Sequence, residues 1–358
     1  MNKNWCLAIS MLFAGQLVMG QEQDADKGGL KINGYIESYY QFNPDKPKDH
    51  TKAPFFYSHG QVNEIAVNLA MLKMSYEKDI VRSSIALGVG SYMNSNYAGE
   101  KGMWQHVVEA NVGVKLAKST NLWIDAGVLP SHIGPESAIG SDNISLTRSL
   151  AAENSPYFET GARLSYTTDD EKWYLAALAL NGWQQIQLTE DQQGLSVGHQ
   201  ITYKPVSNLT LNSSSYLGEQ GKDRLRFFHD FYVQWQSNIG LELLGSFDYG
   251  QQHRPEQDDL GKWWNTGLQA RYWLSPTISV QARGEYFHDK DGMIFGSDEP
   301  SAQEIWGSSA GLDISPISGL VWRLEYRYLD SKGDVFQAHN GSFKPTNHGI
   351  TTSLAWKF

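Results

Sequence analysis

The last eleven residues, His348-Gly349-Ile350-Thr351-Thr352-Ser353-Leu354-Ala355-Trp356-Lys357-Phe358, alternate in polarity up to the end of the chain. One parity carries Ile350, Thr352, Leu354, Trp356 and Phe358, and the other carries Gly349, Thr351, Ser353, Ala355 and Lys357. A repeat of two is that of a β-strand, so one face suits lipid and the other suits water. The segment predicts a transmembrane β-strand, with a half-buried strand of a soluble sheet as the alternative.

The N-terminus agrees with export across the inner membrane. Residues 1–20 carry one early cation, Lys3, then an apolar stretch up to Met19 and small residues around Gly20. This order is typical of a cleavable secretory signal, and the apolar stretch is too short to span a bilayer stably. The one cysteine, Cys6, lies near the start of this segment, whereas a lipoprotein cysteine would follow it. We therefore expect a signal peptide and no lipid anchor.

The composition narrows the class of protein. A mean hydropathy of −0.44, with no apolar run of helix-spanning length after the signal, excludes a helical membrane protein. The composition is still compatible with a β-barrel, because only alternate residues of a barrel strand face lipid. The net charge of −10 argues against nucleic acid as a partner. Without the signal the chain has no cysteine, so disulfides and thiolate metal sites cannot contribute.

Segments with a period of two, bounded by turn residues, predict about sixteen strands in an all-β chain. We place them at about 31–42, 62–77, 80–94, 103–117, 120–129, 157–168, 171–182, 194–204, 207–218, 226–237, 239–250, 262–273, 276–288, 304–314, 319–330 and 346–358. Residues 171–182 are apolar on both parities, so either the strand is shifted there or a loop packs over that wall.

The connections alternate strictly between short and long. Short turns at 78–79, 118–119, 169–170, 205–206, 237–238, 274–275 and 315–318 separate longer loops. This alternation is typical of an up-and-down barrel with both termini in the periplasm, and a soluble jelly roll or sandwich has no reason to keep it. Composition shows no break within residues 31–358. We expect a signal peptide at 1–20, a polar leader at 21–30 and one transmembrane barrel domain at 31–358.

Charged side chains within the strands share one parity. In the fifteenth predicted strand, Arg323, Glu325 and Arg327 alternate with aromatic and aliphatic residues. Arg283 and Glu285 do the same in the thirteenth, and Arg271 lies in the twelfth. A charged ladder in a lipid-facing strand must point inward, so these side chains predict a water-filled lumen.

The connection from Pro130 to Pro156 is the longest after the signal and the third long loop in order. A sixteen-strand barrel with an extended third loop resembles the general porins, whose third loop folds into the lumen and sets its narrowest point. The stretch from Gly127 to Tyr166 is similar to the putative β-barrel porins of the OmpL-like family, a resemblance that covers essentially residues 31–358. It is carried by Gly134-Pro135-Glu136, Asn143, Thr147-Arg148-Ser149, Pro156 and Thr160-Gly161. The resemblance implies topology and pore function; an outward surface loop is the alternative.

Charges on that loop define a candidate constriction. Glu136, Asp142, Arg148 and Glu153 belong to it, and the three acids could face the arginines across a narrow lumen. Opposite charges across such a gap would order water and sort solutes by charge. The alternative is that the arginines pair with neighbouring wall acids, Glu285 and Glu325.

The final aromatic residues carry a second resemblance. Phe358 ends an amphipathic strand with Trp356 on the same face, which resembles the signal by which Gram-negative outer-membrane barrels are recognised for assembly. It implies the barrel-assembly machinery and outer-membrane lipid as partners, and the bacterial outer membrane as the location.

Motifs of catalysis and cofactor binding are missing. No His-Glu-x-x-His segment, Gly-x-Ser-x-Gly elbow or phosphate-binding glycine loop appears, and the ten histidines lack metal-ligand spacing. We expect no enzyme and no cofactor.

The sequence therefore favours an outer-membrane porin for passive diffusion of small hydrophilic solutes and ions, with a homotrimer as one oligomeric state. A porin specific for sugars or phosphate stays open, because Trp123, Tyr35 and Tyr39 on the inward parity could stack on sugar rings. The alternative from another class is a non-conducting barrel for surface adhesion or partner binding.

Overall fold

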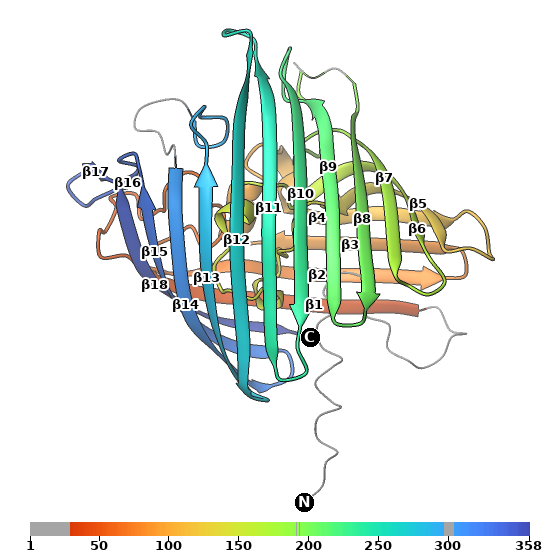
Figure 1. Cartoon of the computed structure of the whole chain (residues 1–358). Coiled ribbons are helices and arrows are strands. Elements are labelled where there is room, and N and C mark those ends of the chain that lie inside the picture. The colour runs from red at the N-terminus through yellow and green to blue at the C-terminus, as the bar shows by residue number, and fades with distance from the viewer. Residues whose placement is uncertain (1–28, 191, 193, 297–303) are drawn as a thin grey trace, which may run out of the picture.

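The computed structural model describes residues 29–190, 192, 194–296 and 304–358. The predicted signal peptide and residues 21–28 of the leader lie outside this part of the chain. The described strands form one closed antiparallel barrel, in which β1 pairs with β2 on one side and with β18 on the other. Figure 1 shows the turns that join β8 to β9 and β10 to β11 at its lower rim, near the C-terminus.

Sixteen strands make the wall, as the period-two pattern predicts. They are β1 (Gly29–Phe42), β2 (Ile65–Lys78), β3 (Val81–Val89), β4 (Val107–Lys115), β5 (Leu122–Pro130), β6 (Phe158–Thr167), β7 (Trp173–Leu180), β8 (Ser196–Val206), β9 (Leu209–Glu219), β10 (Leu225–Gln236), β11 (Leu241–Arg254), β12 (Asp259–Ser275), β13 (Ile278–His288), β14 (Glu304–Ile317), β15 (Leu320–Ser331) and β18 (Thr346–Lys357). Two short strands, β16 (Phe336–Gln337) and β17 (Phe343–Lys344), form a separate hairpin.

The long connections hold the remaining elements, and we number the loops L1 (43–64), L2 (90–106), L3 (131–157) and L8 (332–345). L2 holds α1 (Ser91–Asn96) and the 3₁₀ helix η1 (Gly102–His106), and L3 holds η2 (Gly140–Asp142) and α2 (Leu150–Glu153). Among the described residues, no helix has the length and apolar character needed to cross a bilayer.

Two predicted strand ends are wrong on either side of L2. The strand expected over 80–94 stops at Val89, and the one expected over 103–117 starts at Val107. Gly90 has a φ of 127°, a conformation that ends the extended strand, and α1 begins at the next residue. The inserted turns carry Tyr92 and Met93, which are fully buried. Packing of these side chains inside the barrel therefore overrides the strand periodicity.

The outer wall is apolar along alternate positions. In β18, Ile350, Leu354 and Trp356 are exposed, while Thr351, Ser353 and Ala355 are buried. The same alternation holds in β15, where Trp322, Tyr326 and Tyr328 are exposed and Arg323 and Arg327 are buried. Exposed apolar side chains around a closed sheet suit hydrocarbon, and closure leaves no strand edge for lipid to meet.

Loops L1 and L3 pack inside the barrel and complete its core. Phe55 and Phe56 of L1 join Ile133 and Leu150 of L3 in one buried cluster. Leu178 and Leu180 of β7 belong to the same cluster, together with Phe228 of β10, Trp263 of β12 and Phe287 of β13. The sequence left two explanations for the apolar character of both faces of β7, a shifted strand or a loop packed over that wall. The cluster favours the packed loop. In Figure 1 the yellow-green ribbon of this region lies behind β10 to β12.

Candidate functional site

Four arginines from the wall hold the backbone of L3 inside the lumen. Arg271 of β12 and Arg323 of β15 both donate to Ile144 O at 2.8 Å. Arg323 also donates to Gly140 O at 2.7 Å, and Arg271 donates to Asn143 O. Arg283 of β13 donates to Thr147 O at 2.6 Å, and Arg327 of β15 donates to Arg148 O at 2.9 Å. Backbone carbonyls between Gly140 and Arg148 thus face a basic strip of wall.

Wall carboxylates bind the peptide N–H groups of the same loop. Glu325 Oε2 accepts from Thr147 N at 2.6 Å, and Glu285 Oε2 accepts from Leu150 N at 2.6 Å. Irregular backbone buried away from water must find such partners, and charged ones give the stronger bonds. The wall therefore satisfies donors and acceptors of L3 alike, which fixes the loop across the lumen.

The arginines are also paired with wall acids. Arg327 lies 2.6 Å from Glu285, and Arg283 lies 3.2 Å from Glu285 and 3.1 Å from Glu325. Arg323 lies 2.9 Å from Asp313. Arg271 lies 3.6 Å from Glu242 and 3.7 Å from Asp313. Four cations thus meet four carboxylates, and the cluster carries no net charge when all eight are ionised.

The sequence pattern predicts that the three acids of L3 face the arginines across the lumen, but they contact other groups. Glu136 accepts from Gln269 Nε2 at 2.7 Å, and Asp142 pairs with Lys357 at 2.9 Å. Glu153 Oε2 accepts from the backbone N–H groups of Tyr57 and Ser58 in L1, at 2.8 and 3.0 Å. None of the three forms a described ion pair with the arginines, because the wall acids and the loop carbonyls already occupy the guanidinium groups.

Arg148 points away from the basic strip. Its side chain is fully buried, with the guanidinium 4.4 Å from the ring centroid of Tyr157 and 5.6 Å from that of Tyr92. Its three side-chain nitrogens have no hydrogen-bond partner within the described residues. The cation is therefore held by two aromatic faces, an arrangement that stabilises a desolvated charge.

A histidine at the start of L3 contacts two acceptors. His132 Nδ1 lies 2.7 Å from Glu159 Oε2, and Nε2 lies 2.8 Å from Ser215 O. Only an imidazolium can donate at both nitrogens, so the geometry calls for a protonated His132. Burial alone would lower the pKa of His132, but the Glu159 carboxylate and the two hydrogen bonds outweigh it and raise the pKa. The sequence pattern missed this anchor, since His132 and its two partners lie in three separate segments.

L1 is a second inward loop that periodicity did not reveal. Phe55 and Phe56 are 6% and 8% exposed although they lie in a polar connection. Glu37 and His59, both with 0% exposed area, lie 3.3 Å apart and join L1 to β1. An adjacent aromatic pair in a long loop was the available sign, because such a pair needs burial.

The three inward aromatic side chains that were candidates for stacking on sugar rings contact other protein groups. Trp123 is 5% exposed beneath the Arg82 guanidinium, 4.3 Å from the ring centroid. Tyr35 OH accepts from Ser141 N at 3.3 Å, and Tyr39 OH accepts from Gln61 N at 2.8 Å. Tyr35 and Tyr39 thus bind loops to the wall, whereas Trp123 packs against a side chain from another wall strand.

The C-terminal aromatics lie at the closing seam of the barrel. Phe358 O accepts from Gly34 N at 2.8 Å, and Gly34 O accepts from Phe358 N at 3.0 Å. The Phe358 ring occupies the space where a Cβ at Gly34 would stand, 2.1 Å from the nearest ring atom. The Trp356 ring lies 4.9 Å from it. The last residue thus takes part in the pairing of the last strand with the first.

The arrangement supplies groups that position the loops, together with paired charges. Within the described ranges, no group of three or more His, Cys, Asp or Glu residues could hold a metal ion. What the site can do is narrow a polar lumen with two fixed loops.

Comparison with known proteins identifies the type of barrel. A family model described as putative beta-barrel porin-2, OmpL-like, matches residues 29–358. No curated protein sequence matches significantly. Solved structures with the same fold include the outer membrane channel DcaP of Acinetobacter baumannii, with a TM-score of 0.62, 9% identity and coverage of 94% of this chain and 99% of that one.

Two further structures agree with it. The trimer form of OmpT from Vibrio cholerae has a TM-score of 0.63 at 10% identity, with coverage of 93% of this chain and 100% of that one. The anion-selective porin from Comamonas acidovorans has a TM-score of 0.60 at 8% identity, with coverage of 93% and 100%. These likenesses show a shared fold. With the family match over nearly the whole barrel, they show that the chain belongs to the OmpL-like putative beta-barrel porin-2 family of the bacterial outer membrane.

Proposed function

We propose that this porin passes small hydrophilic solutes and ions by passive diffusion through a lumen narrowed by L1 and L3. The observation that carries the proposal is the fixed position of L3 inside the barrel, bound by Arg271, Arg283, Arg323 and Arg327 through its carbonyl groups. A barrel that only displays surface loops needs no arginines in its wall to bind a loop inside the lumen. A fixed loop across a polar lumen sets the largest solute that can pass.

We assign the constriction residues two roles. The arginines, with Glu285 and Glu325, set the position of L3. Each arginine has a carboxylate neighbour, so this cluster contributes little to charge selectivity. Glu136, Asp142, Arg148 and Glu153 act within L3 or between L3 and its neighbours, and they keep the loop's shape. Selectivity then depends on charges elsewhere along the path.

Single-channel recording tests the proposal. Refolded protein should give current steps of reproducible size in planar bilayers. Those steps should fall when polymers small enough to enter the lumen are added to the bath, and they should recover with polymers too large to enter. A barrel refolded to the same β content that gives no steps would support the non-conducting alternative.

A row of polar side chains on the outer wall supports association of copies as a homotrimer. His199 of β8, Ser215 of β9 and His229 of β10 are neighbours in register at mid-strand, on the parity of exposed Val197, Leu217 and Phe231. Ser215 Oγ lies 2.5 Å from His199 Nδ1, and Ser213 Oγ lies 3.3 Å from His229 Nε2. These polar groups bond to one another while facing hydrocarbon. Polar groups in hydrocarbon are costly, and a second protein surface could pair with them.

Light scattering in detergent tests this association. A Ser215→Val/His229→Leu variant should lose the oligomer, and a Thr266→Val variant, altered at an outward residue of β12, should keep it. An unchanged mass in the first variant would place the interface on another wall.

A further inference from the structure

One large cavity opens between L1 and L8, on the side of the long loops. Its volume is about 490 Å³, within the roughly 300–1,000 Å³ of sites that bind small molecules. L1 supplies one wall, L8 and β15 supply the other, and Thr147 at the tip of L3 contributes to the lining. The cavity therefore lies directly over the segment of L3 that the arginines hold.

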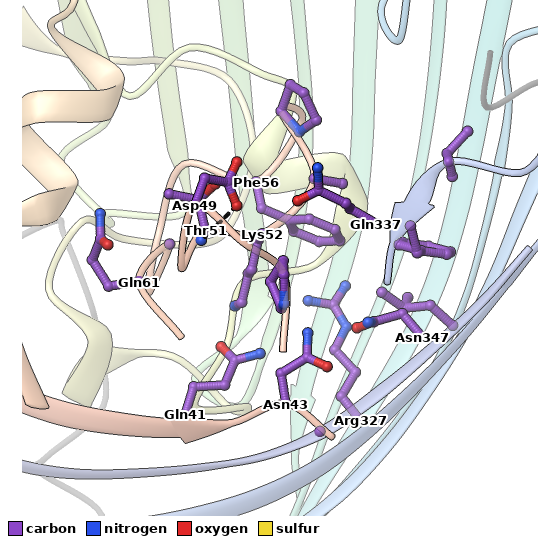
Figure 2. Close-up of a pocket in the computed structure, with 18 of the residues that line it drawn as sticks. Gln41, Asn43, Asp49, Thr51, Lys52, Phe56, Gln61, Arg327, Gln337 and Asn347 are labelled. Carbon is purple, nitrogen blue, oxygen red and sulfur yellow. Dashed lines mark hydrogen bonds between the residues drawn. The ribbon is translucent and has the colours of Figure 1, made fainter. Parts of the chain in front are cut away.

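An unpaired cation reaches into this cavity. Lys52 of L1 is half-buried, and no described residue forms a hydrogen bond or an ion pair with its ammonium group. Its nearest described aromatic is Phe56, with the nitrogen 5.5 Å from the ring centroid. Figure 2 shows Lys52 beside Gln41, Asn43 and Arg327, with their polar ends turned toward a common space.

The other two charged side chains that line the cavity, Arg327 and Asp49, have ion-pair or hydrogen-bond partners. Arg327 is paired with Glu285, and Asp49 is exposed and accepts from Thr51 N. Burial lowers the pKa of Lys52 to about 7, with Glu153 and Glu325 opposing the fall and Arg327 and Arg283 adding to it. An anion that enters the cavity would stabilise the charged form of Lys52, because it would give the ammonium group a partner.

Carboxamides dominate the polar lining. They come from both walls of the cavity: Gln41, Asn43, Gln61, Gln337 and Asn347. Gln41 is only 6% exposed, and its Oε1 has no partner among the described residues. Gln337 Oε1 is in the same state. An amide both donates and accepts, which suits hydroxyl groups that do the same.

Aromatic side chains complete the lining. Phe56 and Phe336 are buried, and Phe343 is 45% exposed beside them. Aromatic faces suit the apolar C–H face of a sugar ring, and a simple inorganic anion would gain nothing from them.

We propose that this cavity binds a sugar acid, meaning a single sugar ring with one carboxylate, on its way into the pore. Lys52 pairs with the carboxylate, the carboxamides bind the hydroxyl groups, and the phenylalanines cover one face of the ring. The inference rests on the proposed channel function and adds a solute class to it.

Current block by matched solutes tests the inference. Glucuronate and glucose share a ring and differ in the carboxylate, so they are added in turn to the side of the long loops. Glucuronate should block the current saturably at a concentration at least about tenfold lower than glucose, the worth of one charge-assisted hydrogen bond. The difference should shrink as the pH rises from 6 to 8, as Lys52 loses its proton.

Variants of L1 assign the effect to one residue. Lys52→Gln should lose the preference for glucuronate, and Lys48→Gln, at an exposed position of the same loop, should keep it. Circular dichroism and gel migration check that both fold. Equal block by the two solutes, an unchanged preference in Lys52→Gln, or equal block by acetate would overturn the sugar-acid site.

Failure of the channel itself would be seen separately, as the absence of current steps in salt alone. Calorimetric titration of the detergent-solubilised protein with glucuronate and glucose would then still decide the binding site, with a preference for glucuronate supporting it and no preference overturning it.

Discussion

At the scale of single residues, several charged side chains bind the inner loops to the barrel wall. Arg323 donates to carbonyls of L3 and pairs with Asp313, and His132 joins the start of L3 to Glu159 and Ser215. Each side chain satisfies groups that would otherwise be buried without partners, which costs about 1–3 kcal/mol per group. Residues that the sequence assigned to solute sorting thus also determine the shape of the lumen.

His132 should make the stability of the barrel depend on pH. Its pKa is raised in the folded state, so its contribution is complete below the ordinary value near 6.5 and is lost as the pH rises through the raised value. His132→Gln can donate toward only one acceptor and should cost about 1–3 kcal/mol at pH 6. Urea unfolding between pH 5 and 9 measures this. A variant with the wild-type pH slope would show that another group is responsible.

At the scale of elements, L3 and the wall form one bonded unit. Removing all four arginines would leave Glu242, Glu285, Asp313 and Glu325 buried without their cations. If the arginines only sorted solutes by charge, such a variant would keep its fold and shift selectivity toward cations. The ion pairs now predict a large loss of stability, because a buried charge left alone is costly.

A double-variant cycle separates loop positioning from charge. Arg283→Gln removes the bond to Thr147 O and one partner of Glu325, so we expect a loss of about 3–5 kcal/mol and larger, noisier current steps. Adding Glu325→Gln should recover part of the stability, since glutamine still accepts from Thr147 N. Urea unfolding and single-channel recording measure the two effects. Strictly additive losses would mean that the pair is not coupled.

The seam between β1 and β18 should depend on the last residue. Phe358→Asp replaces a ring that covers Gly34 with a charge, and it should lower the amount of assembled barrel in the outer membrane far more than the stability of barrel already folded. Heat-modifiable migration of outer-membrane fractions measures assembly, with Leu354→Ile on the same strand as the control. Wild-type levels of Phe358→Asp would argue against a terminal assembly signal.

At the scale of the whole molecule, the exposed apolar face sets the conditions for folding. Alternate side chains around the wall are large and apolar, from Ile36 on β1 to Trp356 on β18. Polar side chains of the opposite parity line the inside, where L1 and L3 narrow the lumen. A barrel of this kind is stable only where hydrocarbon or detergent covers its outer face.

Residues 21–358 should therefore fold only in detergent or lipid. We expect β-rich circular dichroism and a shift in gel migration on heating, both lost in plain buffer. Refolding with and without detergent, followed by size-exclusion chromatography, checks this. A monodisperse folded chain in plain buffer would be incompatible with a lipid-facing wall.

The wall could be predicted from the sequence because its pattern is local. Alternation of side chains and the order of short turns and long loops determine strand number, facing and closure, and they need only neighbours in the chain. Strand ends beside L2 were missed, since burial of Tyr92 and Met93 outweighs alternation there. The inward course of L1, the protonated His132 and the partners of the arginines were decided by tertiary structure. Arg323 and Gly140 are 183 positions apart, and no local pattern specifies which carbonyl a guanidinium finds once the barrel has closed.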